Sequence, residues 1–321
     1  MKKALLLSLN LFIFNYCFCW GFFGHQKINY YAVFLLPPKM MVLYKPNIGF
    51  LSEHAVDPDK RRYVVPDEGP RHFIDIDNYG KYPFSELPRN WDSAVAVFGK
   101  DTITANGIVP WWTLIMLQRL TNAFKKKDQK SILKLSAEIG HYVSDAHVPL
   151  HACHNHNGQF TNQKGIHGLW ESRVPELLAD KEWDFFIGTA RYIYNPSDFI
   201  WTRVLESAAA ADTVLLMESI LSNRFSPDQK YAFETRKDLI VRQYSAAYSI
   251  AYNKMLKGMI ERRMRQSVFA IASFWYTAWV NAGQPDLTNL SNKTFSPEEL
   301  NDFDVLNASW QKATSPEHDC Y

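Results

Sequence analysis

The sequence predicts an all-helical protein with one large domain. Apolar residues recur at three- and four-residue spacing along most of the 321-residue chain, and the alternating runs typical of strands are few. Apolar residues make up 47% of the chain, which is enough to bury a sizeable core. We expect one helical domain over 20–284, preceded by a leader over 1–19 and followed by a polar tail over 285–321.

The leader has the composition of a secretory signal peptide. Two lysines precede an apolar run over 4–14, and the small side chains of Cys17 and Cys19 form a cleavage site. The apolar run is shorter than the roughly 20 residues that span a bilayer, which argues against an uncleaved anchor. A lipoprotein acylated at Cys17 is a further alternative. We expect cleavage before Trp20 and a protein that is secreted or periplasmic.

Helices are expected wherever the three- and four-residue period is strong, and prolines, glycines and asparagines fall between them. The expected helices are 112–126, 131–147, 169–179, 199–222, 237–264 and 265–281. The breakers are Pro149, the loop over 155–165, the Asn195–Pro196 turn, Pro227 and the stop over 283–285. Beyond Pro285 the period is lost, so we expect a loosely attached tail with at most one short helix near Pro297.

Charge and cysteine content narrow the function classes. The chain has 35 Lys and Arg against 33 Asp and Glu, and the two lysines of the leader account for the difference. A processed chain of zero formal charge has no overall field to attract nucleic acid or an anionic membrane. Cys153 and Cys320 remain after processing, and whether they pair is left open. Two thiols make no disulfide framework, so packing or metals must stabilise this chain.

Histidines and carboxylates gather in one window. Six of the ten histidines lie between positions 141 and 167. His141 and Asp145 are four residues apart in an apolar helix, so they share one face, and His167 and Glu171 repeat that spacing. His151 follows the helix end and can face the same cavity. One such pair is most simply a surface contact, but two pairs and a further histidine favour a metal site. Imidazole and carboxylate without thiolate are typical of an open catalytic zinc site.

Two further ligands are expected upstream. His72 lies in an apolar segment and is expected to point inward, with Asp57 or Asp59 as its partner. If Trp20 becomes the first residue, its free α-amine, with an unperturbed pKa of about 8, can lose its proton and bind a cation together with its own carbonyl oxygen. His25 would complete that site. Ordinary polar or solvated roles are expected for His54, Asp75, Asp77, His147, His154 and His156.

This ordered set resembles the superfamily of zinc-dependent phospholipases C and class I, single-strand-specific zinc nucleases. Members share an N-terminal Trp, a nearby His, an Asp and His pair, the motif H-x-x-x-D-x-x-x-x-x-H and a final H-x-x-x-(D or E). They have an all-helical fold with three zinc ions. The match extends from Trp20 to Glu171 and comprises Trp20, His25, His72, His141, Asp145, His151, His167 and Glu171.

The resemblance implies a ligand set for each of three zinc ions. One ion would be bound by Asp57, His72, His141 and Asp145, the second by Trp20, His25 and Asp145, and the third by His151, His167 and Glu171. Asp57 is preferred to Asp59 for its fifteen-residue distance from His72, and Asp57 and Asp145 are the expected catalytic carboxylates. The resemblance further implies that two ions sharing Asp145 activate a water, as hydroxide, to attack phosphorus.

The substrate class is divided between two branches of the superfamily. Glu171 stands where the nuclease branch usually has Asp, which favours phospholipase C-type activity on a phospholipid head group. A single-strand-specific endonuclease or 3′-nucleotidase is the alternative, and a non-catalytic exported zinc-binding protein is a third hypothesis. We expect no stable protein partner, while peripheral contact with a membrane is compatible with the first hypothesis.

Overall fold

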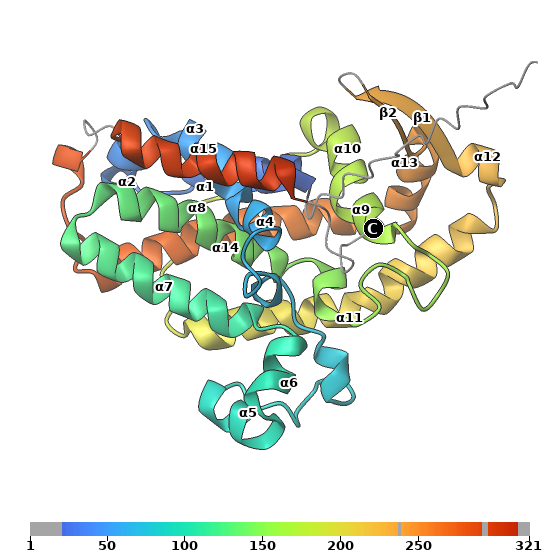
Figure 1. Ribbon diagram of the computed structural model, residues 1–321, viewed down its shortest axis with the longest axis horizontal. Helices are drawn as coiled ribbons and strands as arrows, with labels where there is room; N and C mark the ends of the chain where they lie inside the picture. The colour runs from blue at the N-terminus through green and yellow to red at the C-terminus, as the bar shows by residue number, and fades with distance from the viewer. Residues whose placement is uncertain (1–20, 237–238, 291–294, 314–321) are drawn as a thin grey trace, which may run out of the picture.

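The computed structural model describes residues 21–236, 239–290 and 295–313 of the chain (Figure 1). The leader, Trp20 and Cys320 lie outside the described residues, so the cleavage site, the terminal amine and the pairing of Cys320 remain predictions. Helices dominate the described part, as predicted, and they are joined by short 3₁₀ turns and one hairpin. Within the described part, no helix has the length and apolar character needed to cross a membrane.

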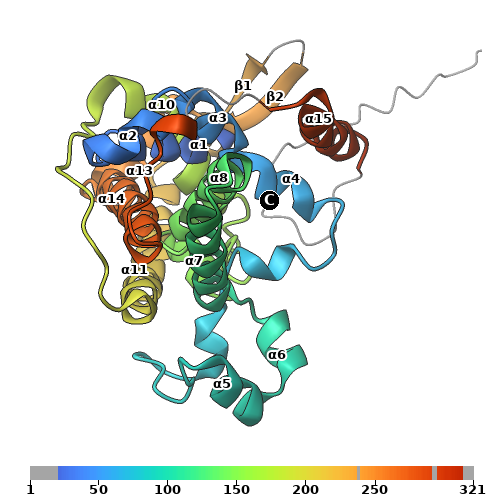
Figure 2. The same ribbon diagram turned by 90° about the vertical axis from the view of Figure 1, so that its left-hand side faces the viewer.

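The first half of the chain supplies the elements that carry most of the predicted ligands. Its helices are α1 (Gly21–Val33), α2 (Pro38–Tyr44), α3 (Ile48–Glu53), α4 (Asp57–Arg62), α5 (Trp91–Phe98), α6 (Lys100–Ala105), α7 (Val109–Lys126) and α8 (Gln129–Asp145). Its 3₁₀ turns are η1 (His54–Val56), η2 (Gly69–Arg71) and η3 (Ile76–Tyr79). In both views α5 and α6 form a small lobe below the main body (Figures 1 and 2).

The second half completes the body. Its helices are α9 (Ile166–Gly168), α10 (Val174–Glu182), α11 (Pro196–Ser222), α12 (Pro227–Lys230), α13 (Ala246–Met255), α14 (Met259–Asn281) and α15 (Pro297–Lys312). The 3₁₀ turns are η4 (Pro149–Ala152) and η6 (Thr288–Leu290), and η5 (Leu169–Arg173) is one turn of π-helix. The strands β1 (Tyr231–Arg236) and β2 (Leu239–Tyr244) pair antiparallel, with Tyr231 opposite Tyr244.

The core lies between α8 and the helices packed around it, α1, α7 and α14 (Figure 2). Aromatic residues of α14 fill it: Trp275 is fully buried, packs against Tyr44 and donates its indole N–H to the Ser136 carbonyl at 2.9 Å. Helix α8 begins one turn before Ile132 because the Asp128 carboxylate accepts the Ser131 amide at 3.2 Å, as an N-cap does. This core fixes α8, which carries two of the predicted ligands, in the middle of the molecule.

The predicted helix over 237–264 is wrong in its first part and at its end, where 259–264 belong to α14. From Tyr231 to Tyr244 the described chain forms the hairpin, and the helix starts only at Ala246, where the Ser245 hydroxyl accepts the Tyr248 amide. Aromatic and β-branched residues such as Ile240 fit a pleated surface better than a helix, which explains the outcome.

The prediction of a loosely attached tail is wrong for α15. Phe303 of this 16-residue helix is buried and lies against His54, with ring centroids 4.1 Å apart. Trp310 lies 5.3 Å from the ring of Phe22, at the start of α1. Helix α15 therefore packs on α4 and on the beginning of α1 (Figure 2).

Candidate metal centre

Helix α8 brings two polar side chains into the core one turn apart. His141 and Asp145 are both fully buried. Helix α1 can approach this stretch closely because residue 140 is glycine: a Cβ there would lie 2.0 Å from the Asn29 side-chain oxygen. The Asn29 amide instead donates to the Ala137 carbonyl at 3.1 Å, which fastens α1 to α8. The close packing places His25 of α1 beside His141.

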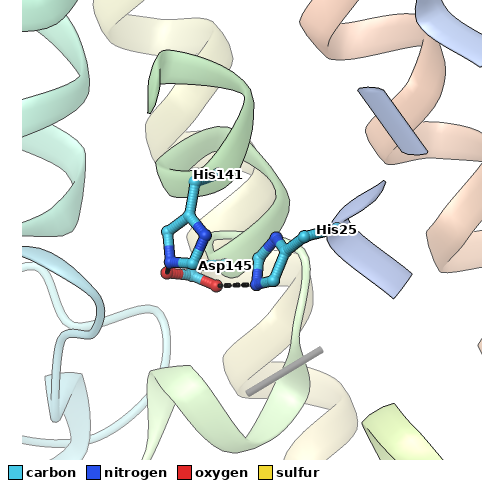
Figure 3. A group of neighbouring side chains, drawn as sticks. All are labelled: His25, His141 and Asp145. Atoms are coloured by element: carbon cyan, nitrogen blue, oxygen red, sulfur yellow. Dashed lines mark ion pairs between the residues drawn. The ribbon is translucent and has the colours of Figure 1, made fainter. Parts of the chain in front are cut away.

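The first candidate metal group consists of His25, His141 and Asp145 (Figure 3). The two imidazole rings are stacked with centroids 3.8 Å apart. His25 Nε2 lies 3.5 Å from Asp145 Oδ1, and His141 Nε2 lies 3.2 Å from Asp145 Oδ2. The side chains reach one point from two helices, as ligands of a shared cation do.

The second group consists of Asp59, His72 and His141; it shares His141 with the first group, and Asp145 of the first group also lies against His72. His72 Nδ1 lies 3.0 Å from Asp145 Oδ2 and 3.7 Å from Asp59 Oδ1. His141 Nε2 lies 3.5 Å from Asp59 Oδ1. Asp145 thus directs one oxygen toward His25 and the other toward the second group, which is the arrangement a bridging carboxylate needs.

The choice of Asp57 as the partner of His72 is corrected by this geometry. The Asp57 carboxylate is already occupied, because it accepts hydrogen bonds from His54 Nδ1 at 2.7 Å and from Lys60 Nζ at 3.0 Å. Both oxygens of Asp59 are buried and lack a hydrogen-bond partner among the described residues. Residues two apart on a helix point in different directions, so only one of the pair faces the centre.

The third group consists of His151, His167 and Glu171. Glu171 Oε2 lies 2.9 Å from His167 Nε2 and 3.5 Å from His151 Nε2. His151 lies on η4, directly after α8, whereas Glu171 lies in the π-helical turn η5. Such turns are often found at functional sites.

Backbone and hydroxyl oxygens fix the orientation of most of these rings. The Nδ1 nitrogens of His141, His151 and His167 donate to the carbonyls of Ala55 (2.8 Å), His72 (2.7 Å) and His156 (2.9 Å). The Ser144 hydroxyl donates to the His141 carbonyl at 2.7 Å and accepts from His25 Nδ1 at 2.8 Å. The Nε2 atoms are thereby left to face inward, as in metal sites whose ligands are held by outer hydrogen bonds.

His72 has the opposite orientation. Its Nδ1 faces the centre, while its Nε2 lies 3.8 Å from an oxygen of the buried Glu68. Glu68 also accepts from Arg71 at 2.6 Å and is paired with Arg61 at 3.3 Å. The sequence analysis did not single out Glu68, although it lies four residues before His72, the same spacing that marks the two His–carboxylate pairs.

Buried polar atoms without hydrogen-bond partners test whether these groups fit metal ions. Among the described residues, such atoms at the centre include both oxygens of Asp59, Asp145 Oδ1 and the Nε2 atoms of His25 and His151. A buried polar atom left unpaired costs about 1–3 kcal/mol, so a concentration of them at one place needs a ligand to offset it. The residues fit cations, and the described part of the chain offers nitrogen and oxygen ligands there.

The protonation of the centre is set by burial. Burial, and to a lesser degree neighbouring carboxylates, raises the pKa of Asp59 and of Asp145 to about 7. Burial also lowers the pKa of His25 and of His72 well below the usual value. Neutral imidazoles are ready to bind a cation, whereas the two carboxyl groups must each lose a proton to do so.

The structure thus brings together seven of the predicted ligands in buried groups, adds Asp59 and leaves out Asp57. These seven are His25, His72, His141, Asp145, His151, His167 and Glu171. His147, expected to be solvated, is fully buried and its Nδ1 donates to the Val143 carbonyl at 2.7 Å.

No protein-family model matches this chain, and no curated protein matches it. What can be stated of its class therefore comes from its own geometry. It is a mostly helical protein whose described part holds three buried groups of histidine and carboxylate side chains that could bind metal ions.

Proposed function

We propose that the protein is an exported, zinc-dependent phosphodiester hydrolase with three metal ions. The observation that carries the proposal is the placement of Asp145 between two of the metal groups, with the third group formed by the segments that follow α8. Imidazole nitrogens and carboxylate oxygens in a site without thiolate favour catalytic zinc. The ordered ligand pattern from His25 to Glu171, shared with zinc phosphodiesterases, supports the same reaction class.

The predicted ligands can be assigned to the individual ions. His25 and Asp145 would hold one ion, together with the amine and carbonyl of Trp20, which lie outside the described residues. The remaining ions would be held by Asp59, His72, His141 and Asp145, and by His151, His167 and Glu171. When bound, zinc supplies a water of near-neutral pKa and positive charge for the phosphate oxygens. Asp145 would contribute one oxygen to each of two of the ions, and the surrounding core excludes bulk water.

A phospholipid head group is the first candidate substrate. Glu171 as the last ligand matches the phospholipase branch of the superfamily that the sequence resembles. The proposed reaction class does not depend on this choice of substrate, because any phosphodiester offers the same oxygens to the metal centre.

Single-stranded nucleic acid is the second candidate, and one observation favours it. In the loop between the ligands His151 and His167, the ring of Phe160 is 65% exposed and stacked on His154 at 5.0 Å. An exposed aromatic pair beside a metal centre is a surface on which a base can stack. Asp75 lies next to this pair, and its buried Oδ1 lacks a hydrogen-bond partner among the described residues.

Turnover of bis-p-nitrophenyl phosphate is the direct test of the reaction class. We expect activity that a chelator abolishes and zinc restores. Comparing phosphatidylcholine with single-stranded DNA and RNA then assigns the substrate. A protein that binds its full complement of zinc and hydrolyses none of these diesters would be a zinc-binding protein, and the proposal would fail.

The processed N-terminus can be tested separately. A variant with one extra residue ahead of Trp20 should lose one of three zinc ions, because the α-amine is displaced from the first group. Unchanged metal stoichiometry in that variant would remove the terminal amine from the ligand set.

A further inference from the structure

The hairpin of β1 and β2 stands out from the helical body beside α10 and α13 (Figure 1). One face of it is turned toward the protein, where Ala232, Glu234 and Val241 are half-buried. The opposite face is open in its outer part, where Phe233 and Ile240 are each 73% exposed, whereas Tyr244 at its base is buried against Tyr248. Antiparallel ribbons that face water on one side normally carry polar residues there, whereas this hairpin exposes large apolar side chains to the solvent.

The exposed apolar face has a positively charged neighbour. Arg242 lies directly opposite Phe233 in the register, is itself exposed, and its guanidinium is 3.7 Å from the ring centroid of Tyr231. Of the described side chains on this face, none is acidic; the hairpin's Glu234 lies on the other face, paired with Arg173. A second cation, Lys164, is exposed where the base of the hairpin meets the body.

The hairpin is fastened to the segment that carries two predicted ligands. Arg173, two residues after Glu171, donates its Nε–H to the Tyr244 carbonyl at 2.9 Å and is paired with Glu234. The Tyr244 hydroxyl donates to the Lys164 carbonyl at 3.4 Å, three residues before His167. Contacts with the base of the hairpin therefore lie in the sequence on both sides of His167 and Glu171, two ligands of the third metal group.

We propose that this hairpin face, comprising Phe233, Ile240 and Arg242, is a contact site for the surface of a phospholipid bilayer that contains anionic lipid. Phe233 and Ile240 enter the interface between head groups and acyl chains, and Arg242 meets lipid phosphates. This inference rests on the proposed function and names its substrate class, since a hairpin held beside the third metal group would bring the centre to a lipid phosphodiester.

A membrane explains the combination better than a soluble ligand does. Phe233 and Ile240 are each 73% exposed, so a small molecule bound against them would remain mostly in water. Two bulky apolar groups with an adjacent cation, and no acidic side chain among the described residues of the same face, match an anionic interface, where apolar burial and charge attraction add.

Vesicle sedimentation of the full mature protein in the presence of a chelator tests the binding without any turnover. The probes are phosphatidylcholine vesicles with and without phosphatidylglycerol. Phe233→Glu combined with Ile240→Glu should weaken partitioning by roughly a hundredfold, given the apolar area withdrawn from the interface. Arg242→Gln should weaken it by about fivefold, and only on vesicles with phosphatidylglycerol.

A matched control is Val97→Glu, since Val97 is 63% exposed on α5, in the lobe away from the hairpin. It should bind vesicles as the wild type does. All variants should keep wild-type thermal unfolding and wild-type turnover of bis-p-nitrophenyl phosphate, because the substituted side chains are solvent-exposed and belong to none of the metal groups.

Three results would overturn the inference: no vesicle binding by the wild type, unchanged binding by the double variant, or an equal loss in Val97→Glu. Self-association that disappears in the double variant while vesicle binding persists would identify the face as a contact between copies of the chain instead. Each result is independent of catalysis, because the proposed function fails only if wild-type protein hydrolyses no diester.

Discussion

In the described part of the chain, the polar side chains buried around Glu218 and those of the candidate metal centre are satisfied in different ways. Around the fully buried Glu218, Lys230 Nζ donates at 2.7 Å, the Tyr248 hydroxyl at 2.6 Å and Gln163 Nε2 at 2.5 Å. In the candidate metal centre, both oxygens of Asp59 and the Oδ1 atom of Asp145 are equally buried and lack such donors among the described residues.

The comparison separates two reasons for burying charge. A carboxylate whose oxygens all receive donors from its own chain stabilises the fold, and breaking its pairs leaves an uncompensated charge. A carboxylate that faces another carboxylate and inward-pointing imidazoles lowers the stability of the metal-free chain. Binding of a cation would offset this loss. The Glu218 cluster thus serves as the internal control for the metal centre.

The largest effect is expected from Asp145→Ala. Loss of the bridging carboxylate should release two of three zinc ions and reduce phosphodiester turnover by at least about a thousandfold. Metal analysis of the purified variant alongside kinetics checks this. Full metal content with near-wild-type turnover would show that Asp145 does not bridge.

Asp59→Asn is expected to have the next largest effect, with Asp57→Asn as its control. Asp59→Asn removes a ligand and should cost one zinc ion and roughly a hundredfold in turnover. Asp57→Asn weakens hydrogen bonds to His54 and Lys60, so it should cost about 1 kcal/mol of unfolding free energy and no metal. The reverse outcome would return the ligand role to Asp57.

Zinc affinity is expected to depend steeply on pH. The total change should nevertheless be smaller than the effects of the two ligand substitutions. In the metal-free protein the pKa of Asp59 and of Asp145 is raised to about 7, so both carboxyl groups are protonated below that pH. Zinc must displace those protons, so its affinity should fall as pH decreases below 7, by roughly tenfold per pH unit for each proton displaced. Calorimetry between pH 5.5 and pH 8 measures this; a flat affinity would contradict it.

Glu218→Gln is expected to have the smallest effect on zinc content and the clearest effect on the free energy of unfolding. It leaves the half-buried Lys230 beside a neutral amide and weakens a charged hydrogen bond, which should cost about 1.5–3 kcal/mol of unfolding free energy. Zinc content and turnover should stay at the wild-type level. Urea unfolding and metal analysis together decide it, and a loss of zinc would show that the two clusters are coupled.

How much of the site could be predicted follows from where its ligands lie. His141 with Asp145 and His167 with Glu171 were identifiable because a helix places residues four apart on one face. The preference for Asp57 over Asp59 was wrong, because both residues fit the spacing to His72 and only packing decides which of them faces inward. The partners His54 and Lys60, which occupy Asp57, become visible as such only in three dimensions.

The fold shows the same limit. Period alone identified the long helices, but an apolar run such as that around Ile240 is ambiguous between helix and strand, and the hairpin was missed. A short helix was expected near Pro297, where α15 begins, but its attachment to the body was missed. Phe303 and Trp310 are seven residues apart and share a face, which the polar composition of this segment obscured.

The contact between Trp310 and Phe22 joins the first and last described helices, and this has a consequence for biosynthesis. Helix α1 leaves the ribosome long before α15 has been translated. The elements bearing His25 and Asp59 therefore acquire their final packing only after translation of the whole polypeptide is complete. If the predicted leader directs export before the chain has folded, stable cation uptake would take place in the compartment of destination, and the zinc supply there would limit maturation.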